Sequence, residues 1–195
     1  MAKTHHHDDG MATFLSTVDG DTLVSVLIEL ARDHEAVAQR LVRLQTAGRP
    51  QLVAAAFRQK LEGWQRDSRY FQYPEAGVFG RALEMWLRQV ERELLPTSPA
   101  AVLDLAESFI ESDTAFFERA DDSYGDIRRA MDSGCRLWLR AASSCQCPSE
   151  GWTPRLMKLL SGDDYGGRRE LLQQAGQLLG QIELARLRSS MKVAT

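Results

Sequence analysis

Apolar residues recur at helical spacing along nearly all of the 195-residue chain, and no stretch has the two-residue alternation of a β-hairpin. About eight such stretches follow one another, separated by short segments that contain glycine, proline or aspartate. Amphipathic helices joined by short loops pack as hairpins that bury one face. The sequence therefore predicts an all-α fold of about eight helices, stacked as helical hairpins in a short α-solenoid or an irregular helical bundle.

A chain of this length forms one domain or two tightly packed halves. We predict a single helical domain over 14–190, between a disordered tail at 1–13 and a short tail at 191–195. The first tail contains three consecutive histidines, 5–7, which could be native or a cloning remnant. Within the domain, Asp21 is the expected N-cap of the first long helix.

Composition argues against several classes of protein. The net charge of −3 is unlike the basic balance of a dedicated nucleic-acid-binding domain. There is no run of about 18 apolar residues and no signal-peptide core. The three cysteines, Cys135, Cys145 and Cys147, are too few for a disulfide framework. We therefore expect a cytoplasmic protein without membrane contacts.

A faint internal repeat favours stacked hairpins. Residues 121–129 resemble 163–169, and Tyr124 and Tyr165 lie 41 positions apart. This spacing is near the period of about 40–47 residues of two-helix solenoid repeats.

Two pairs of aspartates stand just before expected helix starts: Asp121 with Asp122, and Asp163 with Asp164. Aspartate at this position accepts hydrogen bonds from unpaired backbone N–H groups and lies at the favourable end of the helix dipole. Alternatively, carboxylates from two neighbouring turns could hold Mg²⁺ or Ca²⁺, and with it a metal-dependent enzyme. The cation site requires the two turns to converge.

Charge is segregated along the chain. Residues 104–126 contain eight acids and one base, whereas residues 39–72 contain seven bases and two acids. The two segments could face each other or pair between subunits. The basic segment also contains Trp64, Tyr70 and Phe71, and cations interleaved with aromatic rings can bind nucleic acid. Trp64, however, continues an apolar stripe and is expected in the core.

Motifs for catalysis and for metal binding are missing. The chain lacks Gly-x-Ser-x-Gly, His-Glu-x-x-His and a phosphate-binding glycine loop, and His34 is its only histidine outside the first tail. Cys145-x-Cys147 with Cys135 supplies fewer than the four ligands of structural zinc. We assign no catalytic residue, no metal ligand and no cofactor.

Three stretches, 14–41, 65–71 and 117–123 with its echo at 163–166, resemble a bacterial domain family of unknown function. Members of that family can accompany SWIM-type zinc-finger segments. The resemblance implies an all-helical, repeat-like fold and no particular activity. The SWIM pattern, Cys-x-Cys followed by Cys-x-His, is incomplete here, because no Cys-x-His follows Cys147.

These observations predict a helical-repeat protein that acts as a protein–protein interaction or scaffold module. The alternatives are a nucleic-acid-associated accessory protein and a metal-dependent enzyme that uses the aspartate turns. The residues expected to bind a protein partner are Arg66, Arg69, Tyr70, Phe71, Asp121, Asp122, Asp163 and Asp164.

Overall fold

The computed structural model describes residues 4–45, 48–145 and 151–193. These ranges contain eleven α-helices and no β-strand beyond an isolated bridge between Phe71 and Ala120. The all-α prediction is confirmed, with a helix count near the expected eight. Contacts within the chain divide it into two units, 1–48 and 49–195, and the single domain over 14–190 stays a prediction.

Unit 1 contains three helices: α1 (Thr4–Thr17), α2 (Gly20–Asp33) and α3 (Glu35–Gln45). Helix α1 begins inside the segment that was predicted to be a disordered tail. Asp19, rather than the expected Asp21, is the N-cap of α2, because its Oδ1 accepts a hydrogen bond from Thr22 N at 2.9 Å. His34 is the C-cap of the same helix.

Helix α2 is amphipathic but buries none of its side chains. Its apolar residues Val24, Val26, Leu27, Ile28 and Leu30 are 40–54% exposed. Within the described ranges no single helix is long and apolar enough to cross a membrane; 10–17 and 20–33 meet the test only jointly and are bent by 119°.

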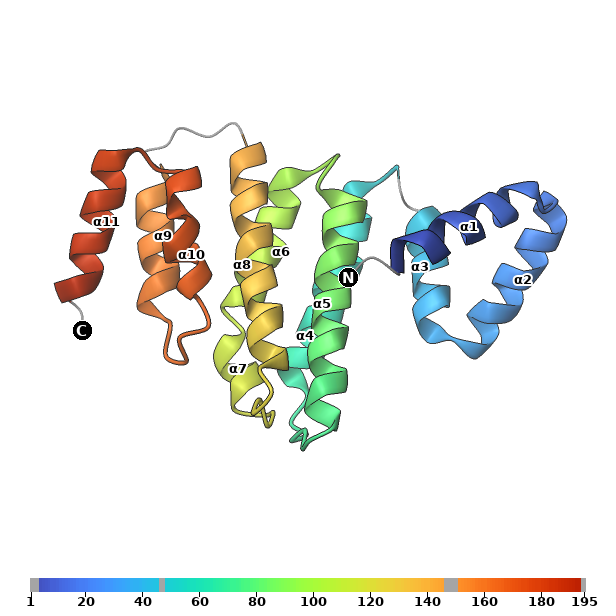
Figure 1. Cartoon of the computed structure of the whole chain (residues 1–195), viewed down its shortest axis with the longest axis horizontal. Helices are drawn as coiled ribbons and strands as arrows, with labels where there is room; N and C mark the ends of the chain where they lie inside the picture. The colour runs from blue at the N-terminus through green and yellow to red at the C-terminus, as the bar shows by residue number, and fades with distance from the viewer. Residues whose placement is uncertain (1–3, 46–47, 146–150, 194–195) are drawn as a thin grey trace. The chain divides into compact units, whose positions relative to one another are not determined.

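Unit 2 is a series of stacked helical hairpins (Figure 1). Its elements are α4 (Pro50–Arg66), α5 (Glu75–Leu94), α6 (Pro99–Ile110), α7 (Asp113–Phe117), α8 (Asp126–Ser144), α9 (Trp152–Ser161), α10 (Arg169–Gln174), the 3₁₀ segment η2 (Ala175–Gln177) and α11 (Gln181–Val193). Helix α8 packs against both α5 and α6, and α10 packs against α8. The hairpins are therefore α4 with α5, α6–α7 with α8, and α9 with α10.

Proline fixes where the first helices of two hairpins begin. Pro50 and Pro99 each occupy the first position of their helix, where the missing N–H costs no hydrogen bond. Aromatic rings then join the hairpins through the core: Trp86 of α5 stacks on Phe109 of α6, with ring centroids 5.7 Å apart. Trp64 is partly buried against this core, as expected.

Close helix contacts depend on two buried glycines. A Cβ at Gly80 would lie 2.7–2.9 Å from atoms of Asp126, and one at Gly134 would lie 2.6 Å from the ring of Phe109. Helix α8 consequently approaches α5 at its first turn and α6 near its middle. These contacts hold the start of α8 beside the start of α5.

Candidate functional site

The three hairpin turns of unit 2, residues 67–74, 118–125 and 162–168, lie at the same end of the unit, and each contacts the next along the chain (Figure 1). We call these residues the turn edge. The first two turns are joined through their backbones: Phe71 N donates to Arg119 O at 2.7 Å, and Asp121 N donates to Phe71 O at 3.0 Å. Phe71 and Asp121, expected separately as partner-binding residues, are therefore neighbours.

Arg119 fastens the end of α4 to the second turn. Its Nη2 donates to Trp64 O at 2.6 Å, its Nη1 donates to Asp67 O, and its Nε donates to Ala115 O at 2.7 Å. Trp64 lies in the last turn of α4 and Asp67 is its C-cap, where carbonyl groups lack the regular helical partner, so this arginine supplies donors to both. The single base of the acidic segment thus has a structural role.

Arg128 joins the second turn to the third. Its Nη1 donates to Gly166 O at 2.9 Å and its Nη2 to Tyr165 O at 3.1 Å. The same guanidinium lies over the Phe117 ring at 5.3 Å, and Phe117 stacks on Tyr165 at 5.3 Å. All three turns are thereby held in one surface.

The second and third turns share one local design, in agreement with the sequence repeat. Asp122 Oδ1 accepts from Ile127 N at 2.7 Å, and Asp163 Oδ1 accepts from Arg168 N at 3.2 Å, five residues on in each case. Three residues after each aspartate, Gly125 and Gly166 have φ of +69° and +66°. Glycine adopts this left-handed conformation without the steric cost of a side chain.

Asp121, Asp122 and Asp163 therefore accept hydrogen bonds from backbone N–H groups of their own turns. Asp121 also accepts hydrogen bonds from Ser123 N and Oγ, which lower the pKa of its carboxyl. Asp164 is exposed. Across the described ranges no three His, Cys, Asp or Glu side chains are grouped as metal ligands would be.

The expected basic residues have acidic partners close in sequence. Arg66 pairs with Glu62 at 2.9 Å, and Arg69 pairs with Asp67 at 2.7 Å. Hydrogen bonds from Arg69 lower the pKa of Asp67 to about 2. Arg69 also lies over the Phe71 ring at 5.4 Å.

Exposed tyrosines line the turn edge. Tyr73 and Tyr124 come from neighbouring turns and stack with their centroids 4.8 Å apart, yet they remain 58% and 66% exposed. Tyr70 is 58% exposed and Tyr165 is 38% exposed. Tyr165 Oη donates a hydrogen bond to Glu118 at 3.3 Å. Partial desolvation and the nearby Glu118 carboxylate raise the pKa of the Tyr165 phenol.

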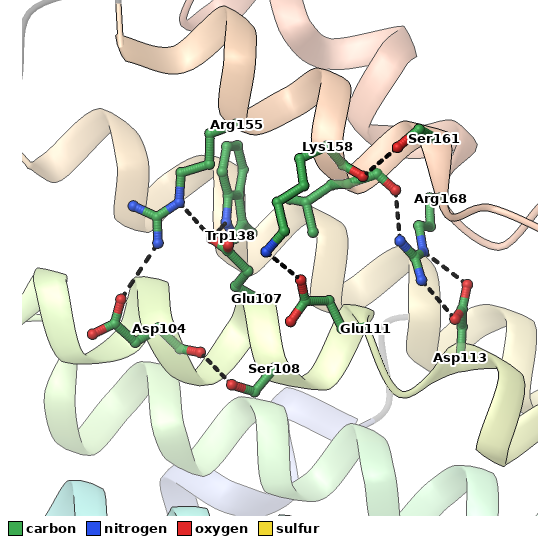
Figure 2. Close-up of polar contacts among 11 residues, drawn as sticks. Asp104, Glu107, Ser108, Glu111, Asp113, Trp138, Arg155, Lys158, Ser161 and Arg168 are labelled. Atoms are coloured by element: carbon green, nitrogen blue, oxygen red, sulfur yellow. Dashed lines mark hydrogen bonds and ion pairs between the residues drawn. The ribbon is translucent and has the colours of Figure 1, made fainter. Parts of the chain in front are cut away.

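The acidic segment pairs with α9 (Figure 2). Glu107 accepts from Arg155 Nε at 2.5 Å and from Trp138 Nε1 at 3.2 Å, and Glu111 pairs with Lys158 at 2.9 Å. These acids therefore pair with bases of α9. One expectation from the sequence was that the acidic segment would face the basic segment 39–72 instead. These contacts hold the second hairpin against the third.

Asp113 of α7 and Arg168 of the third turn form a buried ion pair (Figure 2). Arg168 donates from Nε and Nη2 to the two carboxylate oxygens at 2.8 and 2.7 Å, and from Nη1 to Leu159 O at 2.6 Å. Burial opposes the charge of Arg168, but the Asp113 carboxylate outweighs it and raises the pKa of the guanidinium. The pair fixes the third turn against α7.

The cysteines are not gathered in one site within the described part of the chain. Cys135 is buried in α8, and burial raises the pKa of its thiol. Cys145 is the C-cap of the same helix, and Cys147 lies outside the described residues.

The profile of a family of unknown function, DUF6880, matches residues 12–195. The chain belongs to this family. No curated protein and no solved structure matches it. The matched residues include most of unit 1 and all of unit 2, and the family description assigns no activity to the turn edge.

Sequence reasoning located much of the turn edge but missed residues that assemble it. Arg119, Arg128 and the Asp113–Arg168 pair act through contacts between segments 37–55 positions apart. The tyrosine stack was also missed, although Tyr124 had been noted in the repeat.

Proposed function

We propose that this protein is a helical-repeat module that binds a partner protein through the turn edge of unit 2. The stacked tyrosines, Tyr73 and Tyr124, carry this proposal. Tyrosine is enriched at the energetic centres of protein interfaces, because it offers a large apolar face with a polar tip.

The way the turns are connected supports the same function. Backbone hydrogen bonds between Phe71 and 119–121, with the clamps of Arg119 and Arg128, fix the turn edge before a partner arrives. A preorganised surface loses less conformational entropy on binding. Arg69 and Tyr70 of the first turn and Asp164 of the third turn belong to the same turn edge and are exposed.

The two alternatives receive less support. A metal-dependent enzyme would need the aspartates as ligands, whereas Asp122 and Asp163 use a carboxylate oxygen as a cap. A nucleic-acid-associated protein would need free cations near the rings, whereas Arg66 and Arg69 are paired with acids. Bacterial origin, a cytoplasmic location and association with SWIM-type zinc-finger segments stay predictions.

The test is affinity capture of the tagged full-length protein from its own host, with and without nuclease. We expect a stoichiometric, nuclease-resistant protein partner that is lost in a Tyr73→Ser/Tyr124→Ser variant. A Met85→Ser/Met157→Ser variant is the matched control, because both methionines are exposed but lie on helices away from the turns. Partner capture that is unaffected by the tyrosine changes would contradict the proposal, and partners lost on nuclease digestion would favour the nucleic-acid alternative.

A further inference from the structure

We infer that the turn edge takes a basic segment of its partner, with an arginine guanidinium stacked on the Tyr73–Tyr124 pair. This inference rests on the proposed function and adds the chemistry of the partner. It follows from the two rings, from the aromatic faces beside them and from the charges around them.

Within the described residues, the rings of Tyr73 and Tyr124 stack on each other, and their hydroxyl groups have no hydrogen-bond partner. The rings are 24° from parallel. Tyr124 is fixed through its carbonyl, which accepts from Arg129 Nη1 at 3.0 Å, and Tyr73 directly precedes Pro74, the N-cap of α5. The pair therefore offers an exposed, preorganised aromatic face.

Other rings in the turn edge or directly beside it already hold guanidinium groups. Arg69 lies over Phe71 at 5.4 Å, and Arg128 lies over Phe117 at 5.3 Å. Attraction between a cation and the electron-rich face of a ring favours this arrangement, and arginine forms it most often. No cation from the described residues lies over Tyr73 or Tyr124, so this pair is left for an external one.

Charge around the pair is complementary to a cation. Glu75 directly follows Pro74, and Asp121 is hydrogen-bonded to Phe71 through its backbone; within the described ranges neither carboxylate forms an ion pair. Two arginines of this region are engaged, since Arg69 pairs with Asp67 and Arg129 pairs with Asp126. Carboxylates that form no ion pair attract a basic peptide and repel a phosphate backbone. The observations therefore favour a basic protein segment over a nucleic acid.

The probe is a fluorescein-labelled peptide of alternating arginine and glycine, titrated with the full-length protein and followed by fluorescence anisotropy. Peptides with lysine or glutamate in place of arginine are titrated in parallel. We expect the arginine peptide to bind more tightly than the lysine peptide, because a planar guanidinium stacks on a ring. The glutamate peptide is expected not to bind.

Variants distinguish stacking from general attraction to an acidic protein. Tyr124→Ser should weaken binding of the arginine peptide by roughly three- to thirty-fold, the range for cation–π contacts, while Tyr124→Phe keeps it. Asp121→Asn, which retains the oxygen that accepts from Ser123, should weaken binding and reduce its salt dependence. Met85→Ser should leave binding unchanged.

Equal binding of the arginine peptide to the wild type and to Tyr124→Ser would overturn the inference. So would a single-stranded oligonucleotide that binds more tightly than the peptide and loses affinity in Tyr124→Ser. Either result leaves the proposed function standing if the Tyr73→Ser/Tyr124→Ser variant still loses its captured protein partner. Retention of that partner by the double variant would instead remove the proposed function itself.

Discussion

At the scale of single residues, the strongest constraint is the Asp113–Arg168 pair, whose side chains are 0% and 6% exposed. Both charged groups lose their hydration when the pair is buried. This desolvation penalty is offset because both carboxylate oxygens accept from the guanidinium, which also donates to Leu159 O. Removing one partner leaves the other buried and uncompensated. The exposed pair of Glu111 with Lys158 lacks this property.

Asp113→Ala is therefore expected to lower the free energy of unfolding by about 3–5 kcal/mol. Urea denaturation followed by circular dichroism measures this change. Lys158→Ala is the matched control, because its pair with Glu111 is 68% and 42% exposed and should contribute under about 1 kcal/mol. Similar losses in the two variants would show that burial does not distinguish the pairs.

Cys135 allows a second test at this scale. Burial raises the pKa of its thiol, so the reactive thiolate is scarcer at neutral pH than in the unfolded chain. We expect alkylation of Cys135 by iodoacetamide to be slow in the native protein and fast in urea, as followed by peptide mass spectrometry. Fast native alkylation at pH 7 would mean that α8 is not packed as described.

At the scale of elements, periodicity was sufficient to predict helices but insufficient to predict what covers them. The stripes of α5, α6 and α8 are buried as their spacing implied. The equally regular stripe of α2 is exposed, and its true cap, Asp19, stands two residues before the expected one. A helical period depends on local spacing, whereas burial depends on segments distant in sequence.

Helix packing at Gly134 can be tested with a pair of glycine variants. Gly134→Ala introduces a Cβ within 2.6 Å of Phe109, and overpacking of this kind costs about 1–3 kcal/mol. Gly63→Ala, in an exposed position of α4 with open space around it, should instead stabilise by about 0.4–1 kcal/mol. Thermal unfolding of both variants checks the opposite signs, and stabilisation by Gly134→Ala would contradict the close contact of α6 with α8.

At the scale of the whole molecule, the repeat of Asp122–Gly125 at Asp163–Gly166 was the most informative sequence signal for the candidate site. It indicated that two turns are built alike, and stacked hairpins bring such turns to one end. The sequence could not reveal that Tyr73 completes the surface, because its contact with Tyr124 depends on how α5 and α8 approach each other.

Site-specific photo-crosslinking in the native host tests the protein-binding role of the turn edge most directly. A photoreactive phenylalanine derivative replaces Tyr124 in one full-length variant and Met85 in another, since both side chains are large and exposed. The account predicts a discrete protein adduct from position 124 that is absent from position 85. An adduct from position 85 with none from position 124 would contradict the claim that this protein binds its partner through the turn edge.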